Sequence, residues 1–353
     1  MSEHLPVPGR IEHPDQLEIE DYIEQQKTSE APASDALAQG YSTEVTRMLR
    51  DVERAFEFAK HARSAQTRRT YQSQFNRFVD WCEARNEIPM PASDACVAAY
   101  LASRAEEGTT VATLKVALSA INQAHKRGGF GEPRSSAVVR EVFSGIRRQL
   151  GTRERRVSPI TVDLLRQTVR ALPTDTIKSL RDRALLTLGF AGAFRRSELV
   201  ALDVTDLKFV EAGLEVLLRR SKSDQEGEGV VVGIPMGSDE LTCPVRSVRA
   251  WINYGKLKSG PLFRSTDRGV GPGRLSTRTV ARIVKEAVEA AGLDPNEYSG
   301  HSLRAGLATS AAKAGKPERI ILKHGRWKTR DLLDRYVRDA DLFSENAAAG
   351  IGL

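Results

Sequence analysis

Apolar side chains recur at helical spacing in five successive segments between residues 42 and 151. Positions three and four residues apart share one face of a helix, so each segment predicts an amphipathic helix. Ser93 fits the N-cap of the third helix, Gly128-Gly129 ends the fourth, and Gly151 ends the fifth. The pattern predicts an all-helical domain over residues 42–151. Its apolar stripes are Val45-Met48-Leu49-Val52-Phe56, Tyr71-Phe75-Phe78-Val79-Cys82, Val97-Tyr100-Leu101, Leu114-Leu118-Ile121 and Val138-Val139-Val142-Ile146.

Beyond Pro159 the apolar residues follow strand spacing in some segments and helical spacing in others. Alternating apolar residues from Leu214 to Leu218 and a second apolar run from Val230 to Ile234 predict two strands. The polar, glycine-bearing stretch 221–229 joins them into a hairpin with a long tip. We predict a mainly α fold with a small β component, in which residues 159–353 form an α+β domain. Helical spacing covers Leu164 to Val169, Leu180 to Phe190, and the chain from Leu275 onward, including a short helix from Pro317 to Lys323 that Gly325 closes.

Charge is distributed unevenly along the chain. Residues 1–45 carry ten acidic side chains against Arg10 and Lys27, a net charge of −8, so the rest of this +7 chain carries +15. Residues 1–41 are also weakly periodic and rich in Pro, Ser and Ala, and we expect them to be a disordered tail. A basic body with few aromatic side chains suits a protein that binds the phosphate backbone of duplex DNA. Charge alone fits a merely soluble basic protein equally well.

The segment 152–158 reads as a basic linker between the two domains. Its arginines, Arg153, Arg155 and Arg156, could contact a DNA backbone. An exposed connector is often charged for solubility alone, and the sequence does not decide between these two interpretations.

Several classes of protein are disfavoured by what the sequence lacks. No run approaches eighteen apolar residues, so we expect no membrane span, and residues 1–10 do not resemble a secretory signal. The three cysteines, Cys82, Cys96 and Cys243, are scattered without metal-ligand spacing and fit reduced thiols. We therefore expect a cytoplasmic, nucleoid-associated protein without a metal or a cofactor.

Two pairs of residues in the second domain could carry chemistry, although each pair is ordinary by itself. Arg195 and Glu198 are spaced as i and i+3, which on a helix usually means a surface ion pair. His301 and Arg304 have the same spacing at the start of a predicted helix, where free backbone N–H groups favour an anion. A phosphate held there would meet an imidazole and a guanidinium together.

Three further side chains complete the candidate set, and each also has a plain structural explanation. Trp327 and Tyr336 fit core aromatics when they are considered alone. Lys222 lies in the predicted hairpin tip, where lysines are common and where Arg219 and Arg220 compete for any role. The two histidines without a metal-ligand partner at useful spacing, His125 and His324, are interpreted as structural or surface residues.

The full set matters because it meets the needs of a tyrosine that attacks a phosphodiester. A phenol of pKa about 10 is only about a thousandth ionised at pH 7, which corresponds to roughly 4 kcal/mol. Two arginines that fork onto the non-bridging oxygens offset this cost and stabilise the transition state. A histidine can take part in proton transfer, an indole N–H can donate to a phosphate oxygen, and a lysine can protonate the leaving 5′-oxygen.

Three stretches of the chain resemble the tyrosine recombinases of the phage integrase family, and among them the Cre-type enzymes. They are Ala191-Gly192-Ala193-Phe194-Arg195-Arg196-Ser197-Glu198-Leu199, Gly300-His301-Ser302-Leu303-Arg304-Ala305-Gly306 and Gly325-Arg326-Trp327. Tyr336 follows Trp327 by nine residues, which is similar to the Cre-like form. His324 could be mistaken for the histidine that the family more often has at the Trp327 position, but this spacing favours Trp327. The resemblance covers residues 42–340.

The resemblance implies a C-shaped clamp on duplex DNA, with a helical, SAM-like core-binding domain on one side and a catalytic domain on the other. It implies that a 3′-phosphotyrosyl intermediate and a Holliday junction form within a homotetramer on two recombination sites, without ATP. C-terminal segments then dock on neighbours, although a frayed terminus explains Leu342, Phe343 and Ile351–Leu353 equally well. The implied roles are phosphate binding by Arg195 and Arg304, assistance by His301 and Trp327, general acid catalysis by Lys222, support by Glu198, and attack by Tyr336.

Two other functions stay open at this point. A type IB topoisomerase uses the same chemistry without a defined site, although the compact helical domain over 42–150 is typical of recombinases. A DNA-binding protein without catalysis is the other alternative, because residues 302–325 also look like a helix–turn–helix.

Overall fold

The computed structural model describes residues 64–152, 157–174, 176–219 and 229–330. The chain divides into two compact units, Met1–Glu154 and Arg155–Leu353, and each is described by itself. The acidic tail and the predicted helix around Val45 to Phe56 lie outside the described residues, as do Arg153, Arg155 and Arg156.

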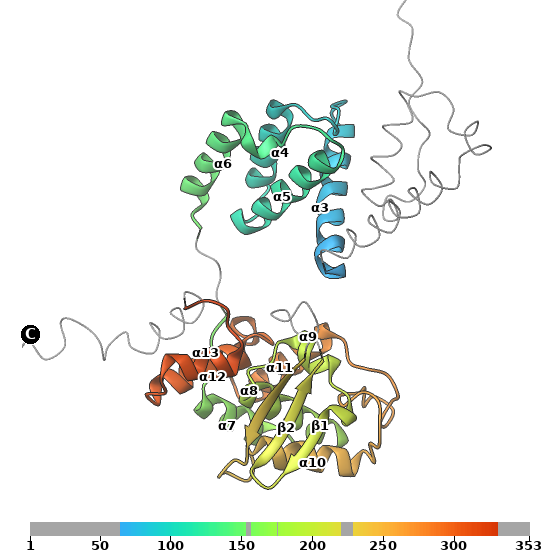
Figure 1. The fold of residues 1–353 in the computed structure, drawn as a ribbon, viewed down its shortest axis with the longest axis vertical. Coiled ribbons are helices and arrows are strands. Elements are labelled where there is room, and N and C mark those ends of the chain that lie inside the picture. Colours follow the sequence, from blue (N-terminus) through green and yellow to red (C-terminus); the bar gives the residue numbers. More distant parts are fainter. Residues whose placement is uncertain (1–63, 153–156, 175, 220–228, 331–353) are drawn as a thin grey trace, which may run out of the picture. The chain divides into compact units, whose positions relative to one another are not determined.

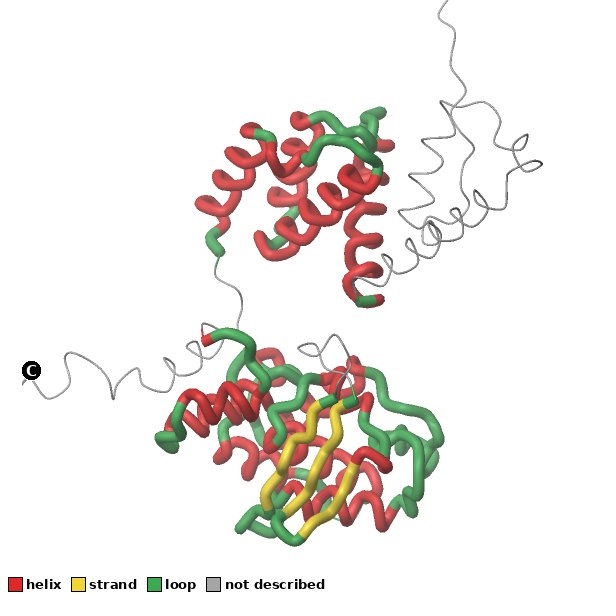
Figure 2. The backbone as a smooth tube through the Cα atoms, viewed as in Figure 1, coloured by secondary structure: helices red, strands yellow, loops and turns green. Residues whose placement is uncertain are grey.

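The described part of the first unit is helical (Figures 1 and 2). Its elements are α3 (Ala65–Glu83), α4 (Asp94–Glu106), α5 (Val111–Arg127), a 3-10 turn (Pro133–Ser135) and α6 (Ala137–Leu150). The predicted helix ends are confirmed: the Ser93 side chain accepts from the backbone N–H of Cys96, and Gly128 and Gly151 cap α5 and α6. Most residues of the four predicted stripes within the described part form one core around Phe78, Tyr100 and Ile121.

Two side chains refine this picture of the first unit. Val138 is 49% exposed while Val139 is fully buried, because consecutive helix positions point about 100° apart and only one can face the core. His125 is buried, with Nδ1 donating to the Ile121 carbonyl and Nε2 accepting from the Ala92 N–H. Burial lowers the pKa of His125, so this imidazole is a neutral structural group.

The second unit is built around a three-stranded antiparallel sheet of order β1-β2-β3 (Figure 2). The strands are β1 (Leu207–Val210), β2 (Gly213–Leu218) and β3 (Val230–Pro235). The predicted hairpin is confirmed by the pairing of Leu214 with Ile234 and of Val216 with Val232. The helices are α7 (Val162–Ala171), α8 (Ile177–Ala191), α9 (Arg196–Ala201), α10 (Pro244–Tyr254), α11 (Thr277–Ala290), α12 (Ser302–Lys313) and α13 (Glu318–Gly325), with 3-10 turns at Val204–Asp206 and Pro295–Glu297.

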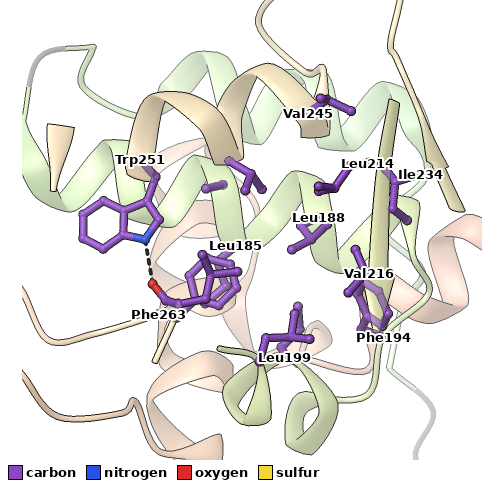
Figure 3. Packing of buried hydrophobic residues seen from close by; sticks show 14 of the residues in the cluster. Leu185, Leu188, Phe194, Leu199, Leu214, Val216, Ile234, Val245, Trp251 and Phe263 are labelled. Carbon is purple, nitrogen blue, oxygen red and sulfur yellow. Dashed lines mark hydrogen bonds between the residues drawn. The ribbon is translucent and has the colours of Figure 1, made fainter. Parts of the chain in front are cut away.

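The inward side chains of the sheet pack with α8 and α10 into the main core of this unit (Figure 3). Trp251 of α10 is completely buried, and its indole N–H donates to the carbonyl of Leu262 at 2.8 Å. This core fixes the carboxyl end of α8, from which the candidate site is built. The mainly helical fold with a small sheet, expected from the sequence, is confirmed. Within the described residues, no helix is long and apolar enough to cross a membrane.

Gly306 allows α12 to approach the chain that leads into α7. A Cβ at this position would overlap the carbonyl group of Ile160. The same backbone is also bonded to α12 one turn earlier, because the Ile160 N–H donates to the Ser302 carbonyl at 2.9 Å. Neither partner can therefore move away easily, and α12 is fixed at the end that carries His301 and Arg304.

We expect Gly306→Ala to destabilise the second unit by about 3 kcal/mol, the upper part of the range for overpacking. Gly145→Ala is the matched control, because Gly145 lies inside α6 with nothing within 4 Å of its would-be Cβ. That change should stabilise the first unit by up to about 1 kcal/mol through helix propensity. Urea denaturation followed by circular dichroism measures both. An unchanged transition for Gly306→Ala would show that α12 can shift without cost.

Candidate active site

The turn between α8 and α9 is the centre of the candidate site. Gly192 caps α8, and Ala193 has a left-handed backbone with φ of 46°, which costs an L-residue about 1 kcal/mol. The next residue, Phe194, is fully buried, and its ring lies against Gly192 where a Cβ would overlap it. Core packing of Phe194 therefore holds the turn, and the turn places Arg195 at the N-cap of α9.

Glu198 holds Arg195 at two points. One carboxylate oxygen accepts from the Arg195 backbone N–H at 2.9 Å, and the other accepts from the guanidinium at 2.5 Å. The Glu198 side chain is only 2% exposed and that of Arg195 19% exposed, so this is no ordinary surface ion pair. With so little solvent around it, this charge-assisted hydrogen bond is electrostatically stronger than an exposed one. It therefore restricts the arginine to one orientation.

Arg304 comes from α12 and reaches the same turn. It is 2% exposed, its Nη1 donates to the Ala193 carbonyl, and its guanidinium lies 4.2 Å from the ring centroid of Trp327. The Trp327 ring in turn covers Gly325, where any Cβ would overlap it. Arg195, Glu198, Arg304 and Trp327, which lie up to 132 residues apart in the sequence, are thus brought together.

His301 is exposed at the N-cap of α12. The expectation that free N–H groups at this helix start would hold an anion needs correction. The N–H of His301 donates to the Ser299 hydroxyl at 3.1 Å, and that of Ser302 donates to the Ser299 carbonyl at 2.9 Å. Two donors of the first turn are therefore already occupied, and side chains must provide more of any phosphate contact.

The site contains a third arginine that the sequence patterns did not single out. The helix expected to close at Gly325 instead has Arg326 in the left-handed position, with φ of 58°. That position commonly belongs to glycine. The Arg326 side chain is 6% exposed and donates to Glu198, to the carbonyls of Gly192 and Ala193, each at 3.1 Å, and to the His324 carbonyl at 2.9 Å. Burial lowers the pKa of Arg326.

His324 also contacts the turn, but it has a structural partner. Its Nε2 lies 2.7 Å from the Ala191 carbonyl, to which it donates. The cluster therefore combines the guanidiniums of Arg195, Arg304 and Arg326 with the single carboxylate of Glu198, an excess of positive charge that suits an anion. In the part of the chain that the structure describes, no group of three or more His, Cys, Asp or Glu residues could hold a metal ion.

The base of the β2–β3 hairpin is fixed by an ion network. Arg219 donates to the nearly buried Asp206 at 2.7 Å and lies 3.2 Å from Asp203, which also binds Arg274 at 2.6 Å. These contacts give Arg219 a structural role at the base of the hairpin. Lys222 lies outside the described residues, and so does Tyr336, so their positions stay predictions.

The chain matches two protein-family models. Residues 158–342 match the phage integrase family, and residues 57–126 match the phage integrase N-terminal SAM-like domain. The integrase/recombinase XerD homolog of Selenomonas ruminantium is 35% identical over 286 residues, which is 80% of this chain and 84% of the relative. Recombinase Cre of Escherichia phage P1 is 26% identical over 321 residues, which is 85% of this chain and 90% of the relative.

Solved structures show the same fold at lower identity. A lambda integrase tetramer bound to a Holliday junction superposes with a TM-score of 0.54 at 16% identity, over 91% of this chain and 86% of that one. At this identity, the likeness supports the fold and nothing finer.

Proposed function

The chain belongs to the phage integrase family of tyrosine recombinases, and from this premise we propose that it cleaves and rejoins duplex DNA at specific sites with Tyr336 as nucleophile. The observation that carries the proposal is the convergence of Arg195, Arg304 and Trp327 on one turn, with Glu198 fixing the first of them. These are side chains that the reaction requires, and they come from separate segments of the family domain.

The first step is attack of the Tyr336 oxygen on the scissile phosphorus. The bond from phosphorus to the 5′-oxygen breaks, which leaves a 3′-phosphotyrosyl link and a free 5′-hydroxyl. Arg195 and Arg304 stabilise the charge that builds on the non-bridging oxygens. His301 accepts the phenolic proton, and the indole N–H of Trp327 donates to the phosphate.

Lys222 supplies the proton that the leaving 5′-oxygen needs. It lies three residues beyond Arg219, whose contacts with Asp203 and Asp206 fix the chain on that side of the hairpin tip. Attack of a 5′-hydroxyl from a partner strand reverses the chemistry and releases Tyr336. The phosphotyrosyl link keeps the bond energy, so resealing uses no ATP. The arginines supply the positive charge, so neither step requires a metal ion.

We further propose that a homotetramer acts on two DNA sites through a Holliday junction. The same fold occurs in a lambda integrase tetramer bound to a Holliday junction. We also propose that both units bind the duplex and that Arg153, Arg155 and Arg156 contact its phosphate backbone. A DNA substrate places the protein in the cytoplasm, on the nucleoid.

Sequencing the DNA that becomes covalently attached to the protein in cells tests this function. Denatured cell extracts are stripped of non-covalent DNA, and the 3′-ends linked to the protein are read. One or two recurring sequences would support site-specific recombination. Ends spread over all sequences would favour topoisomerase-like relaxation. An absence of linked ends, with the native protein still shifting DNA on a gel, would favour a non-catalytic DNA-binding protein. With the purified protein, the adduct should form in EDTA and without ATP.

A further inference from the structure

Arg326 occupies the junction between the two arginines proposed to bind the phosphate. Its side chain shares the Glu198 carboxylate with Arg195 and shares the Ala193 carbonyl with Arg304. Its own carbonyl accepts from Nη2 of Arg195 at 3.5 Å. A single residue therefore contacts the groups that orient both arginines.

The cost of this arrangement indicates that Arg326 does more than fill space. A non-glycine residue in the left-handed region costs about 1 kcal/mol, and a buried guanidinium has lost its hydration. Its Nε is buried without a hydrogen-bond partner. The guanidinium also lies 5.1 Å from the ring centroid of Phe194, the residue that anchors the turn in the core. The hydrogen bonds that Arg326 donates to the Gly192–Ala193 turn and to Glu198 offset these costs.

We propose that Arg326 is a positioning residue for strand cleavage. It holds Glu198 and the Gly192–Ala193 turn in one arrangement, from which Arg195 and Arg304 take their orientation toward a phosphate. It acts through these two arginines and does not itself contact the DNA. The inference rests on the proposed function, because it assumes that these arginines bind the scissile phosphate.

Arg326→Gly and Arg326→Lys test this role. Glycine suits the left-handed backbone, so a defect in that variant cannot come from strain at the turn. Lysine keeps the charge, but one ammonium group cannot reproduce the hydrogen bonds that the guanidinium donates to Glu198 and to three backbone carbonyls. We expect both variants to form the covalent adduct about 100-fold more slowly, as is typical when reacting groups are misplaced by about 1 Å. DNA affinity should change less than threefold.

A substrate with a methylphosphonate at the cleavage site separates positioning from a general folding defect. Replacing one non-bridging oxygen by methyl removes the negative charge that the arginines neutralise. If Arg326 acts through them, the ratio of wild-type to variant rate should fall at least tenfold relative to the phosphate substrate. An equal ratio on both substrates would overturn the proposal and indicate a purely structural role.

Arg246→Gln is the matched control, because Arg246 lies exposed on α10 and its Nη1 donates to the Gly237 carbonyl. It should cleave both substrates at the wild-type rate. Wild-type rates for the Arg326 variants would also refute the positioning role, while leaving the recombinase function intact. A wild-type protein that forms no adduct would instead contradict the recombinase function itself.

Discussion

Replacing Tyr336 by phenylalanine is expected to reduce the covalent protein–DNA adduct below detection. Phenylalanine keeps the ring but lacks the oxygen that forms the phosphotyrosyl bond, so no residual rate is expected from this residue. A duplex nicked close to the cleavage position measures the effect. The short strand carrying the new 5′-hydroxyl dissociates after cleavage, so the adduct cannot be resealed and accumulates on a denaturing gel.

Binding should survive this change, because phenylalanine retains the aromatic ring and the proposed phosphate contacts belong to other residues. Tyr254→Phe serves as the matched control, since Tyr254 is 56% exposed on α10 and has no role in the proposed reaction. It should form the adduct at the wild-type rate. An adduct from Tyr336→Phe at the wild-type level would falsify the choice of nucleophile and direct attention to another hydroxyl.

The elements that could be predicted from the sequence are those with strong local signals. Ser93 and Gly128 mark helix ends through hydrogen bonds or backbone angles within a few residues, and the structure has both. The β2–β3 hairpin was predictable because its alternation extends over whole strands. The four-residue β1 is too short to show alternation, and its pairing with β2 depends on tertiary context. Helix α10 was missed although Pro244 at its first turn and its buried Val245, Val248 and Trp251 did carry a signal.

In the candidate site too, some features have a local sequence signal and others depend on tertiary contacts. The proximity of Arg195 to Glu198 follows from their i,i+3 spacing at the start of one helix, whereas their contacts with Arg326 join them to a distant part of the chain. No local pattern marks Arg326, because its partners Gly192, Ala193 and Glu198 lie more than 120 residues away. A hint was available in the order Gly325-Arg326-Trp327, where an arginine occupies the position that a helix end commonly gives to glycine.

These contacts also explain why the two arginines should depend on one another. Ala193 accepts from Arg304 and Arg326 with a single carbonyl, and Glu198 bridges Arg326 to Arg195. A shift at any one of these groups changes the hydrogen bonds available to the next. Double substitutions within this network should therefore be strongly non-additive.

Replacing Arg304 by lysine is expected to slow adduct formation by a factor of about 10² to 10³, the usual loss when one donor to the developing charge is removed. The guanidinium is a planar fork of five N–H donors, one of which, at Nη1, donates to the Ala193 carbonyl. It also stacks on Trp327 at 4.2 Å, which a compact ammonium group does not reproduce. Single-turnover cleavage of the nicked duplex measures the rate, with Arg246→Lys as the matched control.

A second variant separates the charge of Arg304 from its geometry. Arg304→Gln removes the charge, while Arg304→Lys keeps it and loses only the planar fork. If charge alone stabilises the transition state, the lysine variant should stay within tenfold of wild type and the glutamine variant should fall far below it. We expect both to fall to similar rates, because a lysine drawn to the Ala193 carbonyl has no second planar donor for the phosphate. A lysine variant near the wild-type rate would show that the fork is dispensable, and that Arg304 acts as a point charge.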